Sequence, residues 1–215
     1  MLFEEILSRE NMQKAYQQVK RNKGCAGVDN VSVEELRKKL IDEWIFIRAE
    51  ILEGKYNPQP VKRIEIPKPG GGKRELGIPV VLDRMIQQAI GQKLAELYDK
   101  DFSETSYGFR AGRNCHQAVK KAQEYINQGY EHVVEVDLEK FFDAVNHEYL
   151  MHVLRERIDD KRVLRLVGRY LKAGIYTGRE IKPNEEGTPQ GGSMSPILSN
   201  ILLDKFDKEM ERRGQ

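Results

Sequence analysis

Cysteine is scarce in this sequence, and its two cysteines, Cys25 and Cys115, lie far apart. That number and spacing exclude a disulfide scaffold and a cysteine-based zinc site, and they fit a reducing cytoplasm. The chain also lacks a long apolar run, and its acidic start, MLFEEILSRE, lacks the pattern of a signal peptide. We therefore expect a soluble, cytoplasmic protein with no membrane partner.

Histidine is also rare, and its four residues show no metal-binding spacing: His116, His132, His147 and His152. The sequence has no zinc-type histidine spacing, no nucleophile elbow and no dinucleotide fingerprint. These absences argue against a hydrolytic triad and against a zinc enzyme.

A strong net charge is also missing, because 36 basic and 34 acidic residues leave only +2. The basic residues are nevertheless concentrated in two stripes on predicted helices, at 9–23 and 155–172. Such stripes suit a phosphate backbone, although each alone is also typical of a solvated helix face. The first stripe contains Arg9, Lys14, Lys20, Arg21 and Lys23, and the second Arg155, Arg157, Lys161, Arg162, Arg165, Arg169 and Lys172.

The hydrophobic content of 39% is enough for a core, and the pattern of apolar residues predicts an α+β fold. A capping box at Ser32 and Glu35 marks one helix start, and Pro196 marks another. A β-hairpin is predicted from Val61 to Pro79. The expected helices cover 2–22, 32–54, 82–97, 114–126, 147–158, 160–173 and the residues from 196 onward, and further strands lie at 132–138 and near 175–176.

Asp137 ends the segment most typical of a buried strand, His132–Leu138. A carboxylate there would project from a rigid edge and could hold a hard cation such as Mg²⁺. Capping a helix or turn is the alternative for such an aspartate. Phe141 and Phe142 follow closely, and either could form the wall of a sugar pocket or simply fill the core.

Two glycine-rich segments could place polar groups against a ligand. At the hairpin tip, Lys68, Lys73 and Arg74 surround three glycines and could approach a triphosphate, unless the tip is a plain exposed turn. In GTPQGG, Gln190 is presented from a tight turn. Neither segment is diagnostic by itself.

Taken in order, five blocks of the sequence resemble those of group II intron reverse transcriptases, also called maturases. The resemblance covers nearly the whole chain. The blocks are NMQKAYQQVKRNKGCAGVD, IPKPGGGKRELGIPVVLDRMIQQAI, SYGFRAGRNCHQAV, VVEVDLEKFFDAVNH and GTPQGGSMSPILSNILLDKFD.

The resemblance implies a right-hand polymerase fold that is rich in helices, with a β-hairpin and a small antiparallel palm sheet. Residues 1–110 would form the fingers, including an extra N-terminal block at 1–30. Residues 111–215 would form the remaining fingers and part of the palm. Small departures from the family pattern, Asn30 and Ala111, affect only loops.

The resemblance also implies roles for individual residues. Asp137 matches the first catalytic metal-binding aspartate, with the carbonyl of Leu138 as a second ligand. Phe142 matches the steric gate against a ribose 2′-OH. Lys68 and Arg74 match triphosphate-binding residues, Gln190 matches a glutamine near the nascent base pair, and Lys14, Lys20, Arg21 and Lys23 are the candidate RNA-binding residues.

The implied chemistry is phosphoryl transfer assisted by two Mg²⁺ ions. The family supplies two further carboxylates from a Tyr-x-Asp-Asp motif, which does not occur before Gln215. We therefore expect an N-terminal fragment that binds RNA but does not polymerise. The partners of the complete enzyme would be group II intron RNA, an RNA template, a DNA primer and dNTP.

Other interpretations remain open at the level of sequence. The chain could be an RNA-binding module that assists splicing without chemistry, or part of a CRISPR-associated or diversity-generating reverse transcriptase. The well-developed block at 11–29 favours the intron type. A homodimer is also possible if the last helix exposes its apolar residues, which are Ile197, Leu198, Ile201, Leu202 and Phe206.

Overall fold

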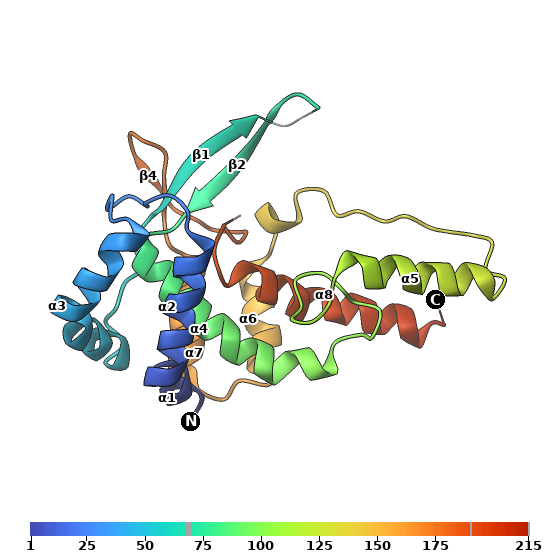
Figure 1. Cartoon of the computed structure of the whole chain (residues 1–215), viewed down its shortest axis with the longest axis horizontal. Coiled ribbons are helices and arrows are strands. Elements are labelled where there is room, and N and C mark those ends of the chain that lie inside the picture. Colours follow the sequence, from blue (N-terminus) through green and yellow to red (C-terminus); the bar gives the residue numbers. More distant parts are fainter. Residues whose placement is uncertain (68–69, 190, 215) are drawn as a thin grey trace.

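Helices make up most of the structure, a computed structural model that describes residues 1–67, 70–189 and 191–214. They form a body from which a β-hairpin and an extended arm project (Figure 1). The helices are α1 (Leu2–Ile6), α2 (Arg9–Asn22), α3 (Val33–Leu52), α4 (Val81–Tyr98), α5 (Cys115–Asn127), α6 (His147–Arg155), α7 (Lys161–Leu171) and α8 (Ser195–Arg212), with short 3-10 turns η1 (Asp99–Asp101) and η2 (Phe141–Asp143).

The helix boundaries follow from caps that the sequence encodes. Ser32 and Glu35 form the predicted capping box, in which each side chain accepts a hydrogen bond from the other residue's backbone N–H. The helix expected over 2–22 is divided, because the Ser8 hydroxyl accepts from the Asn11 N–H and starts α2. Gly24, with φ +103°, follows the end of α2.

The four strands form one small sheet in the order β2-β1-β3-β4. The hairpin pairs Lys62 with Ile78 and, at its far end, Pro67 with Lys73. The β1–β3 pair is parallel and the β3–β4 pair antiparallel, so the sheet is mixed rather than wholly antiparallel. The predicted α+β class is confirmed. The strands are β1 (Val61–Pro67), β2 (Lys73–Ile78), β3 (Ile175–Tyr176) and β4 (Ile181–Lys182).

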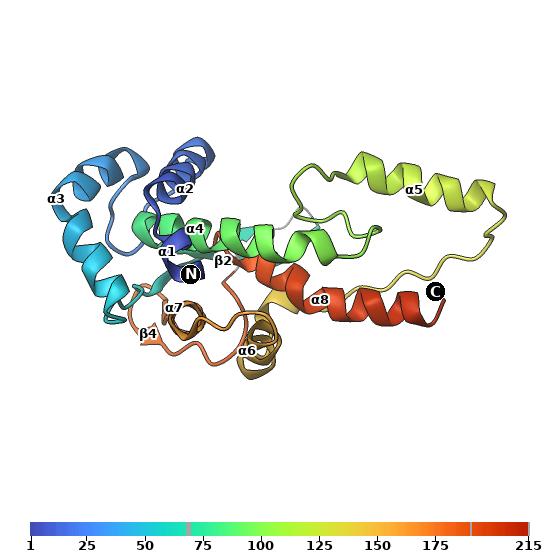
Figure 2. The ribbon, with the colours of Figure 1, turned by 90° about the horizontal axis from the view of Figure 1, so that it is seen from below.

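Helix α4 lies at the centre of the body. Figure 2 shows α2 on one side of α4 and α6 and α7 on the other. Most α4 side chains are buried, among them Ile86, Ile90 and Leu94 with no exposed surface. Burial of each large aliphatic side chain contributes roughly 1.5–3 kcal/mol, so α4 organises a single core from sequence-distant helices.

The strand predicted at His132–Leu138 is wrong. The segment is irregular and exposed, with Val133 and Val134 each 85% accessible and Val136 65% accessible. A β-strand depends on hydrogen bonds to a neighbouring strand, and no strand of the described chain pairs with this segment. With α5, which buries none of its residues, it forms the projecting arm seen in Figure 1.

The start of α4 is tied to two other elements through the buried carboxylate of Asp83. Its Oδ1 accepts from the hydroxyls of Tyr56 at 2.7 Å and Tyr170 at 3.0 Å, and its Oδ2 accepts from the Gln59 N–H at 2.9 Å. Burial raises the pKa of Asp83 to about 6, although these donors oppose the rise. The network joins α4, α7 and the segment after α3.

Helix α8 exposes less apolar surface than expected. Leu198 and Ile201 are buried in the core, whereas Phe206 is 52% exposed. The surface left for a homodimer through this helix is therefore small. No helix in the described part of the chain is both long and apolar enough to cross a membrane.

Replacing Asp83 should change how stability depends on pH. The folded-state pKa, about 6, lies above the usual 3.8, so the folded state holds a proton that the unfolded state releases between about pH 4 and 6. The contribution of this proton to the unfolding free energy is complete below pH 4 and disappears as the pH rises through 6. At about 1.4 kcal/mol per pKa unit, it amounts to up to about 3 kcal/mol.

We expect Asp83→Asn to remove this pH-dependent contribution, as measured by urea unfolding at pH 4, 5, 6 and 7. Asp42→Asn, at an exposed position of α3, is the matched control. The same slope of unfolding free energy against pH in wild type and Asp83→Asn would contradict this assignment.

Candidate active site

Three segments that are distant in sequence meet at the base of the β1–β2 hairpin: the end of β2, the turn η2, and residues 187–189 with 191–192. The Thr188 N–H donates to the Phe142 carbonyl at 2.6 Å, and the Gly187 N–H donates to the Val145 carbonyl at 2.8 Å. These short bonds hold the GTPQGG loop against the turn that carries Phe142.

Two glycines make this close approach possible. A Cβ on Gly187, which has φ +81°, would lie 2.8 Å from the Asp143 carbonyl oxygen and 2.9 Å from that of Phe142. A Cβ on Gly191, which has φ +125°, would overlap the carbonyl oxygen of Gly77 in β2. The loop therefore contacts both neighbours with bare backbone, which only glycine permits.

Phe142 lies at the surface of this junction. Its ring is half-buried and contacts Phe141 edge-to-face, with ring centroids 5.7 Å apart. Phe141 packs against the hydrophobic core. Phe141 therefore packs on the core, whereas Phe142 lies beside the loop. The gate role of Phe142 stays a prediction.

His147 is a residue of this junction that sequence reasoning missed. Its buried ring places Nε2 2.6 Å from the Gly187 carbonyl, an acceptor, so Nε2 carries the proton and donates. Among the described residues, the Nδ1 atom has no hydrogen-bond partner. Because the four histidines form no sequence cluster, only the contact with Gly187 identifies His147 as a support for the loop.

Asp137 and Leu138 lie on the exposed arm, away from the buried setting predicted for them. Mg²⁺ takes several oxygen ligands in near-octahedral geometry. In the described residues, no three His, Cys, Asp or Glu side chains converge to hold a metal ion. One exposed carboxylate therefore does not fit a magnesium site by itself.

The hairpin carries the candidate triphosphate residues. Arg74 lies exposed on β2, paired in register with Ile66. The ion pairs Arg63–Glu75 and Lys73–Glu65 link the two strands across the ladder. The other candidates, Lys68 in the tip and Gln190 in the GTPQGG loop, lie outside the described residues.

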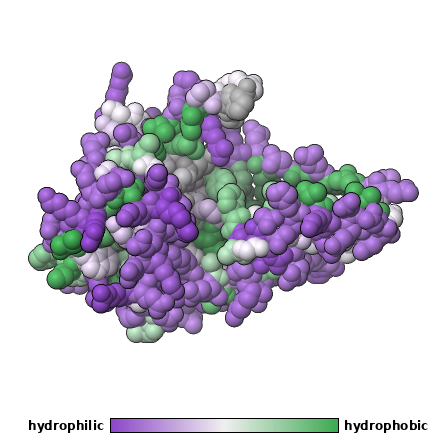
Figure 3. All heavy atoms as spheres, viewed as in Figure 1, coloured by the Kyte–Doolittle hydropathy of each residue, from purple (hydrophilic) through white to green (hydrophobic). Residues whose placement is uncertain are grey.

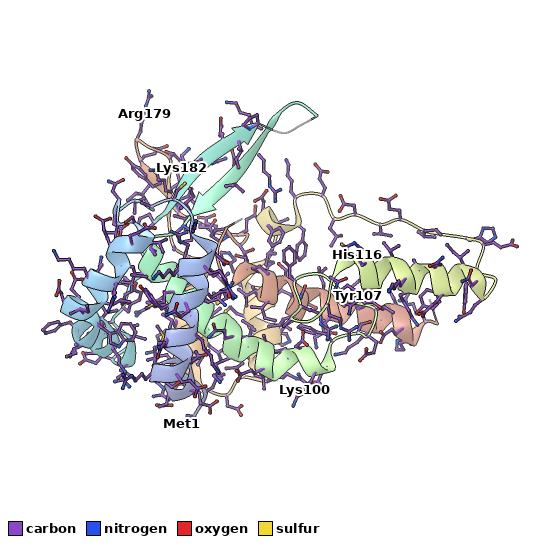
Figure 4. The ribbon with its side chains drawn as sticks, in the orientation of Figure 1. Met1, Lys100, Tyr107, His116, Arg179 and Lys182 are labelled. Carbon is purple, nitrogen blue, oxygen red and sulfur yellow. The ribbon has the colours of Figure 1, made fainter. Side chains whose placement is uncertain are left out.

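More cationic side chains lie near the hairpin. Arg179 and Lys182 project outward from the β3–β4 end of the sheet, on the same side of the body as β1 and β2 (Figure 4). Both side chains are exposed. Glu180 lies 3.2 Å from the Lys182 ammonium and offsets its charge, so Arg179 is the main cation that this edge of the sheet adds.

Helix α2 presents the predicted RNA-binding residues, all of them exposed. Lys14 forms an ion pair with Glu10 at 2.8 Å, and Arg21 donates to the side chain of Gln18. Lys20 and Lys23 have no ion pair in the described chain. Figure 3 shows a hydrophilic face over α2. A shallow groove there, of about 670 Å³, is lined by Glu10, Gln13, Lys14, Gln17, Gln18, Arg21 and Gln92.

Arg84 holds the segment that follows α2. No pattern in the sequence predicted this contact. Its guanidinium donates to the carbonyl oxygens of Lys23 at 3.3 Å and Cys25 at 2.7 Å. A Cβ on Gly24 would lie 2.6 Å from Arg84 Nη1, and one on Gly27 would collide with the backbone of Val80. The basic end of α2 is thereby fixed against the start of α4.

The order and geometry of these segments agree with comparisons to known proteins. Residues 66–214 match the family described as reverse transcriptase (RNA-dependent DNA polymerase). The chain belongs to the reverse transcriptase family. The matched range begins near the end of β1 and includes β2, the turn with Phe142 and the GTPQGG loop.

Similarity to individual proteins covers more of the chain than residues 66–214. Protein YkfC of Escherichia coli is 39% identical over 87% of this chain and 50% of its own length. The group II intron-encoded protein LtrA of Lactococcus lactis is 34% identical over 96% of this chain and 34% of its own. A putative COX1/OXI3 intron 2 protein of Saccharomyces cerevisiae is 34% identical over 93% and 23%. The chain thus spans half or less of these relatives.

Solved structures support the same fold. A chain of the partial Cas6-RT-Cas1--Cas2 complex matches with a TM-score of 0.65 and 23% identity, covering 99% of this chain and 35% of that one. At this identity the likeness shows the fold alone. It supports a reverse transcriptase fold for the helical body and small sheet.

Gly187→Ala should disrupt the junction. The new methyl group would collide with the backbone of η2 and adopt an unfavourable φ, so we expect a loss of roughly 1–3 kcal/mol in unfolding free energy. Gly178→Ala is the matched control, because Gly178 also has positive φ, +91°, but open space around its Cβ position. Equal losses in the two variants, measured by urea unfolding, would show that the close approach is unimportant.

Proposed function

We propose that this chain forms the fingers and the beginning of the palm of a group II intron-encoded reverse transcriptase and maturase. In this proposal residues 1–110 belong to the fingers, and residues 111–215 to the remaining fingers and the palm. The observation that carries it is the meeting of the hairpin, the Phe142 turn and the GTPQGG loop at one junction. The complete protein would copy RNA into DNA and bind its intron RNA for splicing and mobility.

Substrate contacts are assigned to the far end of the hairpin and to the junction at its base. Arg74 and Lys68 would bind the triphosphate of an incoming dNTP, since an arginine fork matches phosphate oxygens and a lysine adds a point charge. Phe142 would lie beside the sugar and disfavour a 2′-OH, and Gln190 would approach the nascent base pair. The template would be RNA and the primer DNA.

For magnesium, the proposal names only the residues that would bind it. Reverse transcriptases generally use Mg²⁺. We propose that the Asp137 carboxylate and the Leu138 carbonyl are ligands in the complete enzyme, which would hold two ions. Further carboxylates must converge on this exposed segment before a site exists.

RNA recognition is assigned to α2 and the segment that Arg84 holds. Lys20 and Lys23 are free to contact phosphates, because no carboxylate in the described chain neutralises them. The neighbouring glutamine amides can both donate and accept hydrogen bonds, as recognition of unpaired bases requires. A CRISPR-associated or diversity-generating enzyme is the alternative, but the similarity to LtrA over 96% of the chain includes α2 and favours the intron type.

Neutralising the end of α2 tests the recognition step. We expect Lys20→Gln/Arg21→Gln/Lys23→Gln to weaken binding to a structured group II intron RNA and to reduce the slope of log affinity against log salt by about 2 to 3. An unrelated structured RNA of equal length shows whether binding is selective. The matched control is Arg37→Gln/Lys38→Gln/Arg48→Gln, which removes three exposed charges from α3.

Equal affinity of the unaltered chain for both RNAs would refute intron recognition by these residues. So would an effect of the α3 control as large as that of the α2 variant. Filter binding from 50 to 300 mM salt resolves both outcomes.

A polypeptide of residues 1–215 should not extend a primer. A single carboxylate without partners cannot position the ions on which the chemistry depends. The assay is primer extension on an RNA template with Mg²⁺ and dNTP, with a complete reverse transcriptase of known activity as the positive control. Magnesium-dependent extension by the purified 215-residue chain would contradict this prediction.

A further inference from the structure

A second basic surface lies on the side of the body opposite α2. It is a groove of about 830 Å³ between α6, α7 and residues 57–58, which follow α3. Figure 2 shows α2 and the pair α6–α7 on opposite sides of α4. One acidic residue, Asp159, lines the groove, whereas its basic residues are Arg155, Lys161, Arg165, Arg169 and Lys172.

The basic residues of α6, α7 and their connection fall into two groups. Arg157 and Arg162 serve the fold, because Arg157 pairs with Asp101 at 2.6 Å and Arg162 pairs with Glu4 at 2.7 Å. Arg169 donates to the Tyr56 carbonyl at 2.6 Å, which fixes one side of the groove. The remaining four, Arg155, Lys161, Arg165 and Lys172, are exposed and form no ion pair in the part of the chain that the structure describes. Folding therefore leaves the charge of the groove available.

The basic residues that line the groove from α7, together with Lys172 just after it, are arranged in a row. Lys161, Arg165, Arg169 and Lys172 recur on one face of α7, over roughly 16 Å at 1.5 Å per residue. A row of this length can follow several consecutive phosphates, since each strand of a duplex carries one charge per about 3.4 Å of axis. A repeating anion fits this arrangement better than a single small ligand.

A smaller pocket continues the groove. It has a volume of about 170 Å³ and shares Arg165 and Arg169 with the groove. Gly54, with φ +67°, leaves room there, because a Cβ at this position would lie 3.1 Å from Arg165 Nη1. Arg165 and Arg169 therefore line both cavities, and Glu53, which pairs with Lys55 at 2.7 Å, also lines the smaller one.

The lining also distinguishes nucleic acid from an acidic protein. A protein partner usually anchors through apolar side chains in an exposed apolar patch. The apolar residues of this groove offer no such patch, because Ile158 is only 2% exposed and Met151 and Leu164 are partly buried. The exposed side chains of the lining are all polar or charged, and most of them are basic.

We infer that this groove binds the sugar-phosphate backbone of a nucleic-acid strand, independently of the α2 surface. The inference rests on the proposed function only in taking the ligand to be a nucleic acid. It assigns to α6 and α7 a second RNA contact that is sequence-tolerant, because contacts to phosphates carry no direct sequence information.

The test compares binding of an unrelated 20-nucleotide single-stranded RNA to three variants. Arg155→Gln/Arg165→Gln/Lys172→Gln should weaken binding at least tenfold at 50 mM salt and reduce the salt slope by about 2 to 3. The α3 control, Arg37→Gln/Lys38→Gln/Arg48→Gln, should bind within about twofold of the unaltered chain. Arg155→Lys/Arg165→Lys keeps the charge and should bind nearly as tightly.

Melting temperatures show whether a variant loses binding only because its fold is destabilised. The three substituted groove residues make no ion pair in the described chain, so the groove variant should melt at nearly the same temperature as the α3 control. Polyglutamate, used as a second probe, represents an acidic protein. Loss of polyglutamate binding with unchanged RNA binding would overturn the inference, as would groove and α3 variants of equal RNA affinity.

Failure of this inference is distinguishable from failure of the proposed function. Intron recognition is measured as the preference of the unaltered chain for intron RNA over unrelated RNA. The groove is measured with unrelated RNA alone. A groove effect without intron preference would support the groove and refute intron recognition, and the opposite pattern would do the reverse.

Discussion

Helix α4 runs through the centre of the body with few of its side chains in water, and the neighbouring helices α1, α2, α3 and α8 pack against it. Its first turn also carries two adjacent charged residues whose side chains point in different directions. Asp83 points inward and gathers Tyr56, Tyr170 and the Gln59 backbone, while Arg84 points toward the segment after α2. The core and the basic end of α2 are thus positioned by one turn of one helix.

The arm formed by α5 and residues 130–140 stands in contrast to this body. Val119 and Ile126 of α5 are 68% and 62% exposed, and the valines that follow are no better covered. Asp137, the residue with the strongest claim to catalysis, therefore lies on the least packed segment. Precise placement of a metal ligand requires a packed support. The geometry of that carboxylate consequently depends on contacts that the body of this chain does not make.

The basic residues are divided in a similar way, into those that support the fold and those that are exposed for binding. The near-zero net charge conceals cations with different roles. Arg110, for example, is buried, with its guanidinium bound to Asp99 and to the carbonyls of Ser103 and Ser106, so it organises a loop. The cations at the end of α2 and along the α6–α7 groove are exposed, and most of them lack acidic partners within the described chain. Binding capacity resides in that unpaired fraction rather than in the total.

The sequence by itself determined the local elements and the family. Helix caps such as Ser32, the hairpin and the helix start at Pro196 are encoded within a few residues, so they could be predicted. The ordered motifs also identified a reverse transcriptase. The same kind of local pattern gave a wrong prediction at His132–Leu138, because alternating valines form a strand only when another strand supplies hydrogen bonds.

Only the tertiary structure decided which residues meet. The approach of Gly187 to the Phe142 turn, the support from His147 and the hold of Arg84 on the Lys23 backbone all join segments that are distant in sequence. Tertiary contacts likewise selected which basic residues of α6 and α7 are paired and which line the groove. These outcomes depend on distances across the fold, which a linear pattern of residue types does not contain.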